Sequence, residues 1–133
     1  MSARSNSVGR HERGSAAVEF ALVLPLVLIM SLVLVQIGLL VKDQVIVEEA
    51  ARAGAREAAV STDDGQVRQA VISAAVGLDE TQLDITVTRQ GGAGSAVTVT
   101  VLYHAAVEIP LVTWLLPPSV ETRGVAVMRQ EVG

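Results

Sequence analysis

Apolar positions run without interruption through the N-terminal third of the chain, and this run predicts a membrane-spanning helix. The 22 residues from Phe20 to Val41 include no charged side chain. At a rise of 1.5 Å per residue they extend roughly 33 Å, enough to cross the hydrocarbon core of a bilayer. Helix-forming residues continue beyond this run as far as Val60. Residues 15–60 are therefore predicted as one long helix, of which residues 20–41 form the transmembrane segment.

The polar half of this helix carries small side chains on one stripe. Ala51, Ala55 and Ala58 recur at helical spacing, and such a surface lets another backbone approach closely. A polar break at residues 61–65 then ends the helix. Asp64 or Thr62 is the expected N-cap of a second helix, whose apolar positions also follow a helical period.

The period of the apolar positions then changes from 3.6 to 2, which indicates strands. Residues 83–88 and 97–107 alternate between apolar and polar side chains, and residues 120–130 form a third, less regular strand. The predicted fold class is α+β. A long N-terminal membrane-spanning helix is followed by a small head, residues 61–133, of one short helix and a three-stranded antiparallel sheet.

Charge is unevenly distributed along the chain. The whole chain carries a net charge of −4, but the first fourteen residues hold three arginines against one glutamate. Because basic residues stay in the cytoplasm, the N-terminus is expected inside and the head outside. No cluster of Lys and Arg follows the apolar run, so a nucleic-acid partner is not expected.

Groups that could support catalysis are sparse. The chain has no cysteine, and His104 lies on an alternating strand as a solvated side chain would. The glycines at 91–94 follow a strand but open no helix and precede no Lys-Ser/Thr pair, so they do not predict a phosphate site. We therefore expect no enzyme activity, no catalytic or metal-binding residues and no cofactor.

Two stretches carry a resemblance to a known family. The first is Gly14-Ser15-Ala16-Ala17-Val18-Glu19-Phe20, and the second is Val47-Glu48-Glu49-Ala50-Ala51-Arg52-Ala53-Gly54-Ala55-Arg56-Glu57-Ala58. Together with the apolar run between them, they resemble the TadE-like family of pilin-like proteins, from tight-adherence (Tad/Flp) pilus systems. Beyond about residue 60 the likeness is one of general plan, a short helix followed by strands.

The resemblance implies processing and assembly roles for four residues. A prepilin peptidase would cut between Gly14 and Ser15, so that residues 1–14 form a basic leader. Glu19 and Phe20 would then serve assembly, with the Glu19 carboxylate pairing with the new N-terminal amine of a neighbouring subunit. The alternative for Glu19 is an interfacial carboxylate that reaches the lipid headgroups.

The implied function is a non-enzymatic minor subunit or assembly factor of a Tad/Flp-type pilus or secretion apparatus. Its expected location is the cytoplasmic membrane, as a single-pass protein, with incorporation into an extracellular pilus as the later destination that the resemblance implies. Its implied partners are the peptidase, other pilin-like subunits, inner-membrane platform proteins and the lipid bilayer.

Flp-type pilins are little more than the helix, so a head with strands argues against the major subunit. An unprocessed, membrane-anchored binding module is the alternative. A secretory signal cut near Ala53 fits less well, because the apolar run exceeds the usual length.

The apolar segment of residues 109–118 allows two interpretations. Its prolines exclude a sheet strand, and it is too short to span a bilayer. It either folds back over the small core, or it forms an interaction patch for a partner or the membrane interface. The residues of that candidate patch are Leu111, Trp114 and Leu115.

The charge distribution leads to a topology prediction. Cysteines introduced at Ser2 and Ser95 should react oppositely with a membrane-impermeant thiol reagent on intact cells. Labelling is expected at Ser95 only, because the arginines at positions 4, 10 and 13 hold the N-terminus inside. Labelling at Ser2 without labelling at Ser95 would reverse the orientation.

Overall fold

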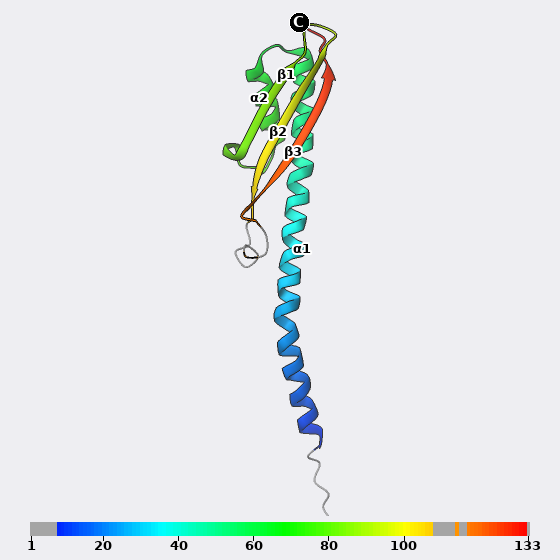
Figure 1. Cartoon of the computed structure of the whole chain (residues 1–133), viewed down its shortest axis with the longest axis vertical. Helices are drawn as coiled ribbons and strands as arrows, with labels where there is room; N and C mark the ends of the chain where they lie inside the picture. The colour runs from blue at the N-terminus through cyan, green and yellow to red at the C-terminus, as the bar shows by residue number, and fades with distance from the viewer. Residues whose placement is uncertain (1–7, 108–113, 115–116, 133) are drawn as a thin grey trace, which may run out of the picture.

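The computed structural model describes residues 8–107, 114 and 117–132, and it consists of a long helix with a small head alongside its C-terminal half (Figure 1). This α+β layout confirms the predicted fold class. The elements, in chain order, are α1 (Val8–Val60), α2 (Asp64–Ala74), the short 3-10 helix η1 (Glu80–Gln82), β1 (Leu83–Arg89), β2 (Ala96–Ala106) and β3 (Ser119–Arg129).

Helix α1 begins at Val8, earlier than the expected start at Ser15. Gly14 is a poor helix former, but one glycine costs only about 1 kcal/mol relative to alanine. That cost is too small to end a helix stabilised on both sides. The helix also continues through Pro25, whose missing N–H removes one backbone hydrogen bond.

The N-cap of helix α2 lies one residue away from each of the two expected caps. Asp63 is the N-cap, and its carboxylate accepts a hydrogen bond from the Gly65 backbone N–H at 2.8 Å. Asp64 lies in the first turn and forms an ion pair with Arg89, at the end of β1. The prediction of Asp64 or Thr62 as the N-cap was wrong. Residues 62, 63 and 64 all have side chains that can cap a helix, and the sequence alone does not show at which of them the backbone enters the helix.

The sheet has the order β1-β2-β3, and both pairings are antiparallel. In the register, Val101 of β2 lies opposite Ile85 of β1 and Gly124 of β3. The alternation predicted for the first two strands is confirmed, since the odd-numbered positions of β2 from Val97 to Val101 are buried. One face of the sheet therefore packs on the helices, and the other is open to solvent.

The core is built from small aliphatic side chains between the helices and the inner face of the sheet. Its buried members are Val47, Ala50, Ala51, Ala55, Ala58, Val67, Val71, Ala75, Ile85, Val97, Val99 and Val101. The predicted small-residue stripe on α1 is thus filled by the head of the same chain. A core of this kind brings backbones close together because few side chains separate them.

Gly124 marks the closest approach between α1 and the sheet. A Cβ built at this position would lie 2.5 Å from the carbonyl oxygen of Val47. Beside it, the Gln44 amide donates hydrogen bonds to the Arg123 carbonyl at 3.0 Å and to the Glu48 carboxylate at 2.9 Å. The contact explains the irregular pattern of the third strand, because a glycine occupies an inward position where an apolar side chain would be expected.

The far end of the head is also attached to α1. The Glu131 backbone N–H donates to the carbonyl of Ala59, in the last turn of the helix, at 2.7 Å. Carbonyls in this turn have no partner within the helix, so the bond satisfies a group that would otherwise need water. The head is therefore fixed to α1 at two levels, near Val47 and near Ala59.

Gly124→Ala should destabilise the head, because the added methyl group meets backbone atoms that cannot rotate away. Overpacking of this kind costs roughly 1–3 kcal/mol, which lowers the melting temperature of a small domain by about 4–8 °C for each kcal/mol. Thermal unfolding of the full chain in detergent, followed by circular dichroism, measures the change. Gly92→Ala is the matched control, since a Cβ there has no neighbour within 4 Å. Equal melting temperatures for the two variants would contradict the close approach.

Candidate functional site

The four residues assigned to processing and assembly lie in the N-terminal turns of α1. Gly14, Ser15, Glu19 and Phe20 are all exposed. The Ser15 hydroxyl donates a hydrogen bond to Glu19 Oε1 at 3.3 Å, across one helical turn. The structure therefore brings Ser15 and Glu19 together, and the carboxylate has a local partner before any cleavage.

The surroundings of Gly14 leave room for a side chain. A Cβ at Gly14 meets nothing within 4 Å. The glycine also lies within α1, so a peptidase that binds an extended segment would first have to unwind this turn. Glycine lowers the cost of unwinding, since it is the weakest helix former after proline. The fold itself therefore does not require glycine at position 14. Any such requirement would come from the peptidase that binds this segment.

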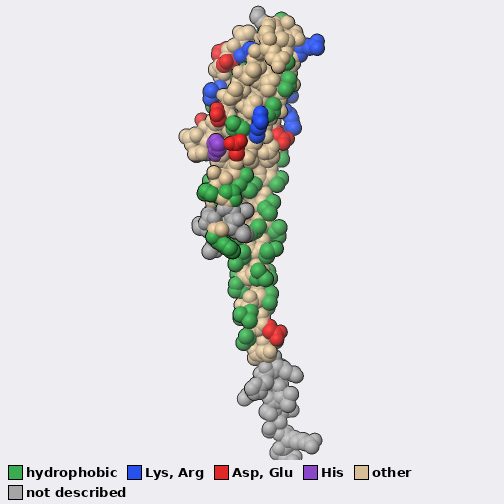
Figure 2. Space-filling model, in the orientation of Figure 1, with side chains coloured by type: hydrophobic (Ala, Val, Ile, Leu, Met, Phe, Trp, Pro, Cys, Tyr) green, Lys and Arg blue, Asp and Glu red, His purple; other side chains and the backbone are tan. Residues whose placement is uncertain are grey.

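The apolar run is almost entirely exposed in the isolated chain. Every residue from Gly14 to Ser31 is exposed, and Phe20 retains 66% of its accessible surface. Figure 2 shows hydrophobic side chains along this part of the helix and charged side chains gathered over the head. Such a surface is unfavourable in water and is typical of a helix surrounded by lipid or by other helices. Burial against the head is first complete at Gln36, which is 1% exposed.

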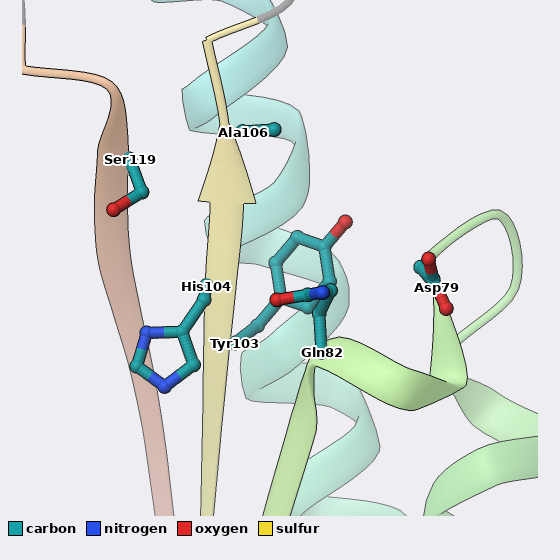
Figure 3. A pocket seen from close by; sticks show the side chains of 6 residues that line it. All are labelled: Asp79, Gln82, Tyr103, His104, Ala106 and Ser119. Carbon is teal, nitrogen blue, oxygen red and sulfur yellow. The ribbon is translucent and has the colours of Figure 1, made fainter.

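An open groove of about 510 Å³ lies at the end of the head nearer the apolar run. Figure 3 shows that Tyr103 and His104 project from opposite sides of β2, with Tyr103 beside Gln82 and with Asp79 on the adjoining turn. His104 is exposed, as the alternation predicted. The hydroxyl and backbone N–H of Thr81 donate hydrogen bonds to Asp79 and hold the pKa of its carboxyl below the ordinary value. These contacts give Asp79 a structural role as the cap of η1.

The described residues contain no arrangement suited to metal chemistry. No group of three or more His, Asp or Glu side chains gathers within this part of the chain. Glu48 and Arg52 form an ion pair at 3.3 Å, and it lies on the surface. Surface pairs of this kind contribute little to stability and do not indicate a site.

Trp114 is the described member of the candidate interaction patch, and it is 74% exposed. An indole with that exposure is not a core side chain. Leu111 and Leu115, the other members of the patch, lie outside the described residues. The surface therefore offers one aromatic group, and the composition of the patch stays a prediction.

Sequence reasoning missed the role of Gln36. It lies in the apolar run, yet its side chain is almost completely buried. The feature of the sequence that could have indicated this burial is an amide side chain among aliphatic residues. A polar side chain within a membrane segment faces a protein contact or a cavity far more often than lipid.

Comparison with known families identifies one match. The model of the TadE-like protein family matches residues 14–56. No curated protein and no solved structure gives a significant match to the chain. The family match confirms the resemblance inferred from the sequence, and it begins at Gly14, the glycine expected before the cut. It indicates a protein related to Tad pili, with an apolar N-terminal helix that fits a single-pass membrane protein.

Gly14→Leu should leave full-length protein in the membrane. The helix accommodates the new side chain, so the block would arise where the peptidase binds the segment. Electrophoretic mobility and the mass of the purified chain report processing. Gly38→Leu is the matched control, because Gly38 also lies in α1 with no atom within 4 Å of a built Cβ. Processing of Gly14→Leu at the rate of the Gly38 variant would show that the cut is elsewhere.

Proposed function

We propose that this chain is a pilin-like minor subunit or assembly factor of a Tad/Flp-type pilus or secretion apparatus, processed after Gly14. One observation carries the proposal above the rest. The TadE-like match begins at Gly14 and covers a helix that projects beyond the head, with every residue from Gly14 to Ser31 exposed. A membrane-anchored binding module would share the projecting helix, but it gives no reason for a family match that begins at the glycine expected before the cut.

The projecting helix has two uses in this scheme. Before assembly it anchors the chain in the cytoplasmic membrane, with the N-terminus inside and the head outside. During assembly the same surface packs on the helices of other pilin-like subunits or of platform proteins. The head covers only the C-terminal half of α1, so both uses leave the head intact.

Glu19 is the residue through which cleavage affects assembly. Cutting after Gly14 creates an ammonium group at Ser15, one turn from the Glu19 carboxylate. The present Ser15–Glu19 hydrogen bond shows that these positions reach one another within one chain. In a helix bundle the carboxylate instead pairs with the amine of a neighbouring subunit. This fixes the axial position of that subunit, because a buried charge without a partner is strongly destabilising.

The head suits contact with other proteins rather than catalysis. Its outer sheet face is open, and Trp114 is exposed. An unprocessed, membrane-anchored binding module shares these features and is the competing function. The N-terminal residue of the membrane-purified protein distinguishes them: Ser15 supports the pilin-like role, and Met1 or Ser2 supports the binding module.

Glu19→Ala should give protein that is processed but not assembled. The substitution makes the segment more apolar and does not hinder insertion, yet it removes the partner of the Ser15 amine. We expect recovery with pilus components to fall about tenfold or more, given the cost of an unpaired charge. Co-purification of the processed chain with those components measures it.

Two further variants separate charge from hydrogen bonding. Glu19→Gln keeps an oxygen that can accept from Ser15 but removes the charge, whereas Glu19→Asp keeps the charge. Assembly should fail for Glu19→Gln and persist in part for Glu19→Asp. Wild-type recovery of Glu19→Ala would exclude the pairing mechanism and leave Glu19 as an interfacial carboxylate.

A further inference from the structure

The outer face of the sheet is rich in branched side chains that no other described element covers. Helices α1 and α2 pack on the inner face, with the core between them and the sheet. Val125 is 49% exposed and Val127 is 61% exposed. Branched side chains are typical of a sheet face that packs on another surface. The central outward positions are Thr86, Thr88, Thr98, Thr100, Val125 and Val127.

One row across this face ends in opposite charges. The register places Asp84 of β1, Leu102 of β2 and Arg123 of β3 side by side. Asp84 and Arg123 are both exposed, and neither forms an ion pair with a described residue. Neighbouring strands are about 4.8 Å apart, so the two charged residues lie on opposite sides of Leu102, roughly 10 Å from each other. This row is therefore acidic at the β1 edge and basic at the β3 edge.

The edges of the sheet are less available to a partner than its face. The Gln44 amide of α1 donates to the Arg123 carbonyl at 3.0 Å, and the Arg68 guanidinium of α2 lies 3.5 Å from the Ile85 carbonyl. Each helix thus reaches a backbone carbonyl of an outer strand, which an added strand would need for its own pairing. A partner would therefore pack on the face rather than extend the sheet.

We propose that the outer sheet face binds the same face of a second copy of this chain, with a two-fold axis parallel to β2. Sheets that pack face to face lie about 10 Å apart, with their strands within about 30° of each other. This axis places β2 over β2 and each β1 over the β3 of the other copy. Asp84 of each copy then faces Arg123 of the other, which gives two ion pairs with Leu102 between them.

The direction of this axis is also the one that a membrane allows. The strands run alongside α1 (Figure 1), so a rotation about β2 leaves both apolar helices pointing the same way. A two-fold axis across the strands would point them in opposite directions, and both chains could not then insert in one membrane with their heads on the same side. The proposal uses insertion of α1, a part of the proposed function, but it does not depend on cleavage after Gly14.

The face is small for a protein interface. Three strands of about seven residues cover roughly 10 by 20 Å, well below the ~800 Å² per partner of a standard interface. We therefore expect a reversible dimer, favoured when both copies are confined to one membrane and their effective concentration is high. The interface is accordingly tested in membranes.

Crosslinking of the full-length chain in isolated membranes tests the contact. The chain has no cysteine, so Thr100→Cys introduces a single thiol, on the central strand of the face. A bis-maleimide that spans about 10 Å, the spacing of packed sheets, should give a covalent dimer, because position 100 lies near the axis in both copies. Ser73→Cys is the matched control, since Ser73 is exposed on α2, which packs on the inner face. It should give only the small amount of dimer that random collision produces.

Charge reversal tests the orientation. In the Thr100→Cys background, Asp84→Arg alone or Arg123→Asp alone should reduce the dimer about fivefold or more, since each replaces two ion pairs by two like-charge contacts. Co-expression of the two variants should restore a crosslink between them. One chain then carries arginine at both positions and the other carries aspartate at both. An ion pair within one chain could not produce this rescue.

Several results would overturn the proposal. Equal crosslinking of Thr100→Cys and Ser73→Cys would show that the face does not meet a second copy. Crosslinking that persists in both charge variants, or failure of the mixed pair to crosslink, would refute the arrangement of Asp84 over Arg123. Both charge variants alter exposed side chains and should keep the wild-type melting temperature in detergent, so a lost crosslink reports the interface and not the fold.

Alkaline extraction of the same membranes separates this proposal from the proposed function. A chain that resists extraction but does not crosslink would refute the interface alone. A chain released by alkali would overturn insertion and, with it, the proposed axis.

Discussion

The close contact between α1 and the sheet is the constraint on which the rest of the head depends. Gly124 brings the backbone of β3 against the backbone of α1 at Val47, and the neighbouring core side chains are valine and alanine. A layer this thin buries little area for each residue, so its stability depends on close packing. It also explains a core almost without aromatic side chains: Phe20 and Trp114 are exposed, and Tyr103 lies at the edge.

Helix α1 has an exposed apolar part and a part covered by the head. The boundary between these two parts does not coincide with the first charged residue after the apolar run. The charge-free run ends at Val41, yet one face of the helix is already buried against the head at Gln36. Opposite that face, Val41 and Val45 remain exposed and extend the apolar surface. The head therefore overlaps the last turns of the apolar run on one side only. The exposed apolar surface and the surface covered by the head therefore meet along a slanted line rather than at one residue.

The sequence predicted those features that depend on local periodicity. A charge-free run was sufficient for the long helix, and an alternating Val/Thr pattern was sufficient for the strands. The start of α1 at Val8 and the cap at Asp63 were missed, because neighbouring residues had nearly equal local preferences. The burial of Gln36 and the contact at Gly124 were also missed, because each brings together residues distant in the chain. No periodic pattern encodes which inward position of β3 must be glycine.

Attachment of the head at both ends has a mechanical consequence. The strands run alongside the C-terminal half of α1, and they are held near Val47 at one level and near Ala59 at the other. Tension applied along the helix from its N-terminal end therefore acts parallel to this interface and loads its contacts in shear, all at once. A head attached at one end would instead peel away contact by contact. The geometry makes the head and the C-terminal half of α1 one mechanical unit, able to transmit a pull on the N-terminal half of the helix to whatever the head touches.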